Sequence, residues 1–77
     1  MKSFNIQSCY IKDSVLYANI GVHLKNCITY RRLTIDGDNL KIGAGSSIDK
    51  IENIKLSDAF INENLAMLKD EIIKLCD

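Results

Sequence analysis

The 77-residue sequence has no long apolar run. No segment approaches the ~20 consecutive apolar residues that a membrane-spanning helix needs. The opening segment, MKSFNIQSCY, also lacks the apolar stretch of a secretory signal peptide. These absences predict a cytoplasmic protein that does not enter a membrane. The length predicts a single domain over residues 1–77.

Cysteine is scarce, and its count is odd. The three cysteines, Cys9, Cys27 and Cys76, include no C-x-x-C pair. In a cytoplasmic protein this pattern predicts reduced thiols rather than a disulfide framework. A metal site built from them and His23 is an alternative, but the spacing matches no zinc motif. Reduced cysteine packs as a small apolar side chain, so we predict no metal site.

Histidine occurs only once, which leaves little material for catalysis. His23 lies at the end of a predicted strand, on the side opposite to the apolar residues of that strand. Cys27 follows four residues later and could form a Cys–His dyad with it. No third orienting group lies nearby in the sequence. We therefore predict that the protein is not an enzyme and uses neither a cofactor nor a small-molecule substrate.

The sequence also lacks a net charge, because ten basic side chains balance ten acidic ones. Dedicated nucleic-acid-binding modules are typically strongly basic. The charges are nevertheless separated: five basic and one acidic residue give +4 over residues 1–34, and five basic and nine acidic residues give −4 over residues 35–77. A dipolar chain of this kind can meet a polyanion with its basic half or pair head to tail with a second subunit.

The first half of the sequence alternates between apolar and polar residues, which is the period of a β-strand. In the first strand Phe4, Ile6 and Tyr10 share one parity and should face the same side. The second strand alternates best and directs its even-numbered residues from Leu16 to Leu24 toward a core. The alternation predicts an antiparallel meander of three to four strands, at about residues 3–11, 15–24, 27–35 and 40–43.

The third predicted strand has mixed parity. Ile28 and Tyr30 belong to one face, whereas Leu33 and Ile35 belong to the other. Either a bulge near residues 31–32 shifts the register, or both faces are covered by protein. The second option requires another subunit, because one C-terminal helix can cover only one face.

After residue 56 the apolar period becomes that of a helix. Ser57 or Asp58 is a suitable N-cap, so we predict one amphipathic helix over about residues 58–76. A helix that follows the meander and packs on it makes an α+β fold. The apolar residues of this helix recur at intervals of three and four: Ile61, Leu65, Leu68, Ile72 and Leu75.

Two segments of the connecting region look like ligand-binding loops. Asp36 to Asn39 could open a calcium loop, but Lys41 stands where glycine is needed and Ser47 where glutamate is needed, so a hairpin turn is predicted. Gly43 to Ser47 lacks the Gly-Lys-Ser/Thr of a Walker loop and the third glycine of a dinucleotide fingerprint. We interpret it as a connection whose serines can contact phosphate.

Arg31 and Arg32 are the only adjacent basic pair in the sequence. In a regular strand their side chains point to opposite faces. One arginine can therefore bind phosphate while the other needs a protein partner. An ion pair with an acidic residue of the C-terminal half is the purely structural alternative.

The segment RRLTIDGDNLKI matches the pattern I-x-x-I-D-G-x-N-G-L-x-V at residues 35–37, 39–40 and 42. With LYANIGVHL before it and IENIKL and SDAFINENLAMLKDEIIKL after it, the chain resembles the stage V sporulation protein G (SpoVG) family of small bacterial regulators. The resemblance implies a homodimer that binds nucleic acid and modulates gene expression. In that family a Met-Pro-Ser-basic-basic loop contacts nucleic acid, and of the residues that stand there, Ala44 to Ile48, only Ser46 matches.

These observations predict a small non-catalytic regulatory protein that binds nucleic acid as a homodimer. The alternative is a small inhibitor or adaptor of the phage or plasmid type, which blocks a partner protein through an exposed strand edge or the acidic helix face. The residues predicted to contact nucleic acid are Arg31, Arg32, Lys41, Ser46, Ser47 and Lys50.

Overall fold

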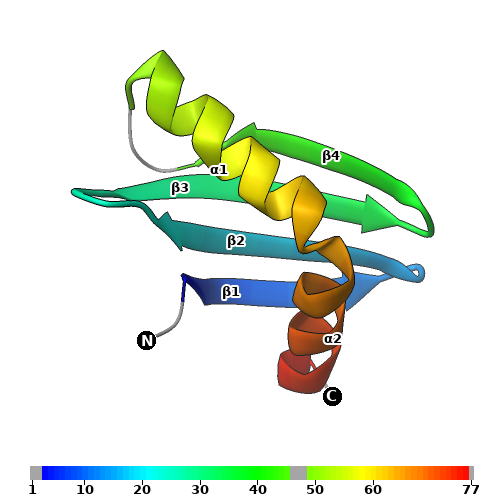
Figure 1. Ribbon diagram of the computed structural model, residues 1–77. Coiled ribbons are helices and arrows are strands. Elements are labelled where there is room, and N and C mark those ends of the chain that lie inside the picture. Colours follow the sequence, from blue (N-terminus) through cyan, green and yellow to red (C-terminus); the bar gives the residue numbers. More distant parts are fainter. Residues whose placement is uncertain (1–2, 46–48, 77) are drawn as a thin grey trace.

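A computed structural model describes residues 3–45 and 49–76 as one antiparallel sheet followed by two helices (Figure 1). The helices are α1 (Ile51–Glu63) and α2 (Leu65–Cys76). The strands lie in sequence order in the sheet: β1 (Phe4–Lys12), β2 (Val15–His23), β3 (Ile28–Asp36) and β4 (Asn39–Ala44). The predicted α+β fold with a meander is confirmed. Each end of a predicted strand lies within one residue of the observed end.

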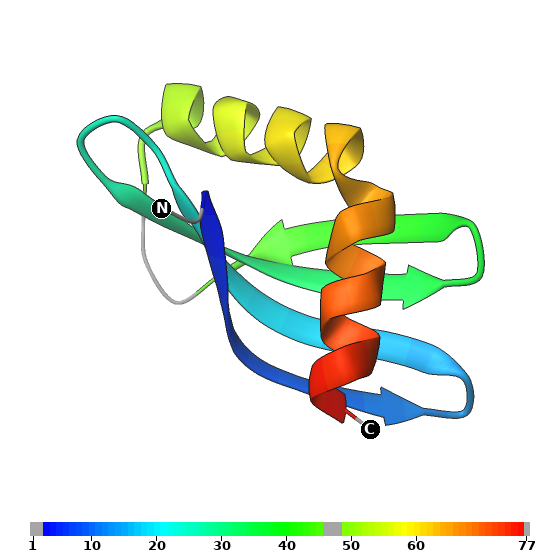
Figure 2. The same ribbon diagram turned by 60° about the horizontal axis from the view of Figure 1, so that its bottom comes forward.

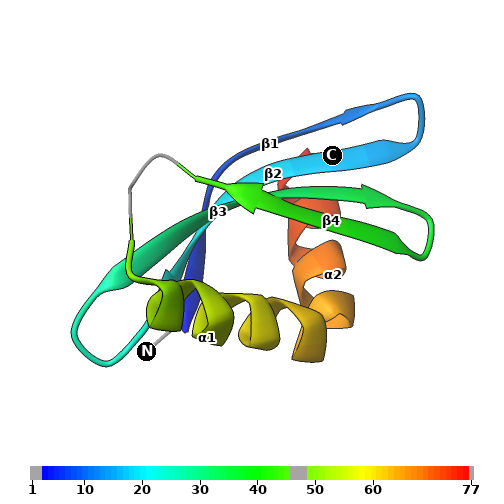
Figure 3. The same ribbon diagram turned by 90° about the horizontal axis from the view of Figure 1, so that it is seen from above.

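Both helices lie on the same side of the sheet (Figure 3). Helix α1 packs against β3, whereas α2 packs against β1 and β2. The apolar parity of β2 faces these helices, as the alternation predicted. Among the described residues the buried core consists of Phe4, Leu16, Ala18, Ile20, Val22, Leu33, Ile35, Ile61, Leu68 and Ile72. Across the same residues no helix is long and apolar enough to cross a membrane.

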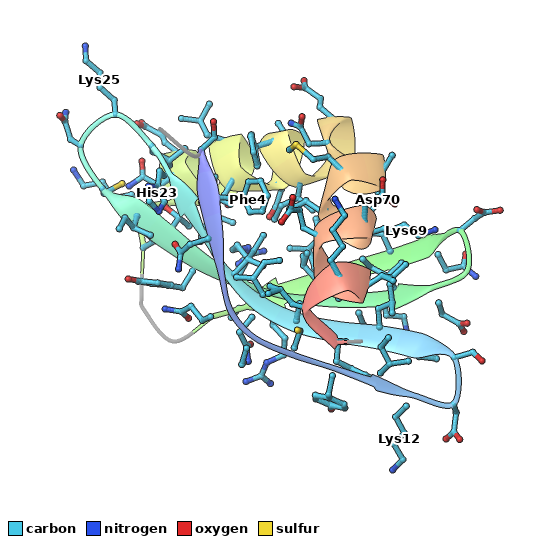
Figure 4. All side chains as sticks on the ribbon, turned by 90° about the horizontal axis from the view of Figure 1, so that it is seen from below. Phe4, Lys12, His23, Lys25, Lys69 and Asp70 are labelled. Atoms are coloured by element: carbon cyan, nitrogen blue, oxygen red, sulfur yellow. The ribbon has the colours of Figure 1, made fainter. Side chains whose placement is uncertain are left out.

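Strand β1 contains a bulge that the sequence pattern did not predict. The register with β2 shifts between Ile6 and Ser8, which leaves Gln7 as the extra residue. Phe4 and Ile6 therefore face the helices, and the ring of Phe4 reaches Phe60 of α1 at a centroid distance of 6.0 Å (Figure 4). Beyond the bulge the alternation is reversed. The prediction that Tyr10 shares a side with Phe4 is wrong for this reason.

Strand β3 is regular, so the alternative of a bulge near residues 31–32 is wrong. Its pairing with β2 and β4 runs without a shift. Leu33 is fully buried on the helix side, while Tyr30 faces away from it. Tyr30 is accommodated because its cross-strand neighbour is Gly21, and an added Cβ there would lie 3.1 Å from the Tyr30 ring. A glycine thus gives the aromatic ring room to lie flat on the sheet.

The C-terminal half contains two helices rather than the one predicted. The first begins at Ile51, seven residues before the predicted start, and its N-cap residue Lys50 makes no side-chain capping bond. Asp49 instead accepts hydrogen bonds from the Lys50 N–H and from Asn53 Nδ2. Hydrogen bonds from Asn53 and Thr29 lower the pKa of the Asp49 carboxyl from its ordinary value of 3.8.

The chain changes direction at Asn64, and Figure 2 shows α2 running steeply across the line of α1. Asn64 has φ −116° and ψ 25°, and its side-chain Nδ2 donates to the Phe60 carbonyl at 2.9 Å. This side-chain bond competes with regular helix geometry. In the predicted stripe Ile61, Leu68 and Ile72 are buried and Leu65 is half-buried. Leu75 is 61% exposed because α2 runs out toward the edge strand β1.

Candidate nucleic-acid interface

The sheet face that carries no helix is the candidate site, and we call it the open face. Alternation along the strands and the register between them place its side chains in three rows. The first row runs Tyr10, Tyr17, Thr34, Lys41. The second runs Ser8, Asn19, Arg32, Gly43. The third runs Asn5, Gly21, Tyr30.

Two tyrosines of the first row form a stacked pair. The rings of Tyr10 and Tyr17 lie 4.6 Å apart with an interplanar angle of 11°. Tyr10 is 57% exposed, so one surface of the stack remains open to solvent. The bulge at Gln7 creates this arrangement, because it moves Tyr10 from the core side of β1 to the open face. A local irregularity in the sheet edge thus builds the most aromatic part of the site.

The second row is polar and crosses the sheet between the tyrosines. Arg32 Nε donates to Asn19 Oδ1 at 3.4 Å, and Asn19 Nδ2 donates to Ser8 Oγ at 2.9 Å. Asn19 thus holds the base of the guanidinium while Arg32 remains exposed. This leaves the remaining N–H groups of Arg32 available for an anion.

Arg32, Ser8 and Asn19 line two hollows that lie on either side of the polar row. One, of about 260 Å³, is bounded by Tyr10 and Tyr17. The other, of about 170 Å³, is bounded by Tyr30 and Gly45. The open face therefore offers an aromatic wall on each side of one arginine.

The charge of the three rows is positive. Arg32 and Lys41 are their cations, and the rows contain no acidic side chain. Lys12 adds a third cation at the end of β1, which Figure 4 shows at the far end of the molecule from Lys25. At the same end Asp36 has the parity of Arg32 in β3 and adds one acidic side chain to the open face. The whole chain is neutral, so the fold has concentrated basic residues on a face that the sequence balance does not reveal.

Arg31 lies on the helix side and binds another side chain of the protein. Its side chain is 10% exposed, and its Nε donates to Asp58 Oδ1 at 3.0 Å while Nη2 donates to Oδ2 at 3.4 Å. This fork is the ion pair with the C-terminal half that the sequence offered as the structural alternative. Asp58 is therefore a partner of β3 rather than the N-cap predicted for it.

The remaining predicted contacts are divided. Arg32 and Lys41 share the open face, as diagonal neighbours in adjacent rows. Lys50 is exposed but precedes α1, on the other side of the sheet. Ser46 and Ser47 lie outside the described residues. Of the four predicted residues that the structure describes, two thus lie together on the open face.

Sequence reasoning missed the three tyrosines. Tyr17 and Tyr30 have the parity opposite to the core residues of their strands, and that parity was a usable signal. Tyr10 gave no such signal, because the bulge reverses its parity. An aromatic residue at a solvent-facing position of a strand is as good a signal of a binding site as the adjacent arginines.

His23 and Cys27, the two residues of the possible dyad, contact other side chains. His23 Nε2 lies 2.9 Å from Asn5 Oδ1, whereas Cys27 Sγ lies 4.0 Å from Thr29 Oγ1. No group of three or more histidine, cysteine or acidic side chains within residues 3–45 and 49–76 is placed to hold a metal ion.

Comparisons with protein-family models, curated proteins and solved structures find no match to this chain.

Proposed function

We propose that the protein is a small, non-catalytic, cytoplasmic regulatory protein that binds single-stranded nucleic acid on the open face of its sheet, as a homodimer. One observation carries the proposal. Tyrosines stand on both sides of an arginine whose guanidinium is oriented by Asn19: the exposed Tyr10 on one side and the half-buried Tyr30 on the other. Single-stranded nucleic acid presents the matching chemistry, which is flat bases linked by phosphates.

Stacking supplies the main part of the expected affinity. A base stacked on an aromatic side chain contributes about 1–3 kcal/mol, and every base has a flat face to offer. The exposed ring of Tyr10, backed by Tyr17, is one platform, and Tyr30 is the other. Arg32 between them can fork onto a phosphate oxygen pair. Aromatic side chains on an antiparallel sheet bind RNA bases in this way in other folds.

The small number of cations favours a single strand over a duplex. Affinity for duplex DNA comes largely from neutralising many phosphates, and the rows of the open face supply only Arg32 and Lys41. Bases within a duplex are already stacked on one another and cannot use the tyrosines. A single strand can use both the aromatic and the basic side chains.

The resemblance to the SpoVG family points to the same class of ligand. The resemblance implies nucleic-acid contacts from the loop after β4, whereas the geometry of the described residues favours the open face. The proposal therefore takes nucleic-acid binding and dimer formation from the resemblance as expectations, and takes the binding surface from the tyrosines and Arg32.

The test is a titration of the protein into labelled single-stranded DNA, single-stranded RNA and a duplex, followed by fluorescence anisotropy at two salt concentrations. We expect single strands to bind more tightly than the duplex. Tyr10→Ala and Arg32→Ala should each weaken binding, the tyrosine change by about 5- to 150-fold, which corresponds to the loss of one stacked base.

Lys55→Ala and Lys74→Ala are matched controls, because both lysines are exposed on the helices and away from the open face. These variants should bind like the parent protein. Equal losses of affinity in the control and open-face variants would show that binding is general electrostatic attraction. Absence of binding to any oligonucleotide at low salt would refute the proposal.

A protein-binding inhibitor or adaptor is the second candidate, and the position of β4 favours it. This six-residue strand lies at the edge of the sheet and pairs only with β3 in the described chain. An extended segment of a partner protein can add to such an edge. Hydrogen-bonded pairs alternate along β3 and β4 from Asp36 and Asn39 onward, so the backbone N–H of Ile42 points away from β3 toward the free edge. Ile42→Pro removes this donor. Loss of a partner protein in this variant, with nucleic-acid binding absent throughout, would favour this candidate.

A further inference from the structure

Two thiols from opposite ends of the chain meet where α2 ends against β1. Cys76 Sγ donates to Cys9 Sγ at a sulfur–sulfur distance of 2.9 Å, across 67 positions of sequence. Both side chains are half-buried and pack against the core cluster. Nothing in the spacing of the three cysteines pairs these two rather than either of them with Cys27.

The fold itself brings the two sulfurs together. The bulge at Gln7 turns Cys9 toward the helices, in register with the buried Ala18 of β2. Ile72 of α2 is fully buried, and it holds the C-terminal part of that helix against the sheet. Cys76 lies one turn further on, at four residues from Ile72, and therefore points to the same side of the helix.

We propose that Cys9 and Cys76 form a reversible intramolecular disulfide when the protein meets a low-molecular-weight disulfide such as glutathione disulfide. A disulfide bond requires sulfurs about 2.05 Å apart, so the two atoms must approach by only about 0.9 Å from their 2.9 Å contact. This inference concerns the helix side of the sheet and does not depend on nucleic-acid binding.

The chemistry is two successive thiol–disulfide exchanges. One protein thiolate attacks a sulfur of glutathione disulfide, forms a mixed disulfide and releases one glutathione thiolate. The thiolate of the neighbouring cysteine then attacks the protein sulfur of the mixed disulfide and releases the second glutathione. Two protein thiols lose two protons and two electrons, and one glutathione disulfide becomes two glutathione molecules.

Cys27 provides an internal comparison. It precedes β3 in the β2–β3 connection, and Figure 2 shows that connection at the end of the molecule away from the C-terminus. Its sulfur lies 4.0 Å from Thr29 Oγ1. Cys27 should therefore take up glutathione as a lasting mixed disulfide or stay reduced, because no second thiol is placed to displace the glutathione.

The bond should stabilise the fold. Closing a loop that spans most of the chain removes conformational freedom from the unfolded state. The last turn of α2 would also be fastened to the sheet at a point where its neighbour Leu75 is exposed. We expect the urea midpoint of the oxidised protein to exceed that of the reduced protein, and the difference to vanish on adding dithiothreitol.

The experiment treats the full chain with glutathione disulfide and counts thiols after denaturation, with mass spectrometry of the intact protein. We expect the thiols of Cys9 and Cys76 to be lost, with no glutathione on either residue and a cross-linked peptide containing both. The intact mass should fall by two hydrogens where Cys27 stays reduced, and should carry one glutathione more where Cys27 is modified. Cys27→Ser should behave in the same way. Cys76→Ser should keep glutathione on Cys9.

Persistent glutathione on both Cys9 and Cys76 of the parent protein would overturn the proposal. So would cross-linked peptides that contain Cys27, or disulfides formed only between chains. These outcomes are read on the parent protein, so they stand even if a cysteine variant fails to fold. Loss of nucleic-acid binding in either redox state would bear on the open face alone.

Discussion

Arg31 and Arg32 are chemically identical neighbours that face opposite sides of β3. Arg31 forms its fork with Asp58 of α1 on the helix side. Arg32 is exposed on the open face and bonds only to Asn19 through the one hydrogen bond found for its side chain in the described residues. The pair lets the same substitution be made in a stabilising contact and in the proposed binding surface.

We predict that Arg31→Ala lowers the free energy of unfolding by about 1.5–3 kcal/mol, the range for hydrogen bonds to charged groups. The change removes the partner of Asp58, whose side chain is 35% exposed and therefore partly compensated by water. Urea unfolding at neutral pH measures the effect. Arg32→Ala is the control and should change stability by less than about 0.5 kcal/mol. Similar losses of stability in both variants would contradict the view that Arg31 stabilises the fold and Arg32 does not.

The opposite orientation of the two arginines could be predicted from the sequence, because side chains alternate along a strand. Which arginine is paired could not. That depends on α1 crossing over β3 so that Asp58 arrives beside Arg31, and the crossing is set by how the helix packs.

At the scale of the element, the break between the two helices is the main departure from the sequence pattern. The apolar spacing continues across Asn64 from Ile61 to Leu68, and both of these residues are fully buried. The apolar periodicity alone therefore predicts one continuous helix. The Phe60 carbonyl accepts bonds from both the Asn64 N–H and its side chain, which gives the chain a local way to turn.

We predict that Asn64→Ala lowers the free energy of unfolding by about 0.5–1.5 kcal/mol, the net value of a typical hydrogen bond. The higher helix propensity of alanine is of little use at a residue with φ −116° and ψ 25°. Urea unfolding with circular dichroism measures it.

Asn62→Ala is the matched control for this prediction. Asn62 makes the same kind of side-chain bond, to the Asp58 carbonyl at 2.9 Å, but within regular helix and in an exposed position. Its loss should leave stability within about 0.5 kcal/mol. A gain in stability for Asn64→Ala would show that packing alone bends the chain.

The bulge in β1 is the other element that sequence reasoning missed, and it has two consequences. It carries Tyr10 to the open face and Cys9 to the helix side. One extra residue in an edge strand reverses every side chain that follows it. The residues at the bulge, Gln7 and Ser8, are both polar, so the apolar pattern of the sequence does not show where the alternation reverses.

At the scale of the molecule, the two faces of the sheet have different roles. One face and the two helices enclose the core, and the other presents the tyrosines and Arg32. A domain of this size buries only about 60% of its unfolded surface, and we expect association with a second copy to add to the buried area.

We predict a homodimer by sedimentation equilibrium, with a mass twice the 8.7 kDa of the chain. Because we propose that nucleic acid binds the open face, the dimer should persist when a saturating single-stranded oligonucleotide is added. A mass of 8.7 kDa at every concentration would contradict dimer formation. Dissociation by the oligonucleotide would instead place the dimer interface on the open face.

The sequence by itself determined the strands, the core parity of β2 and the presence of helix in the C-terminal half, because these follow from local periodicity and turn residues. Only the tertiary structure decided which side Tyr10 and Cys9 occupy, which arginine is paired and where the helix breaks. Each of these depends on contacts between residues far apart in the sequence, and no local pattern records such contacts.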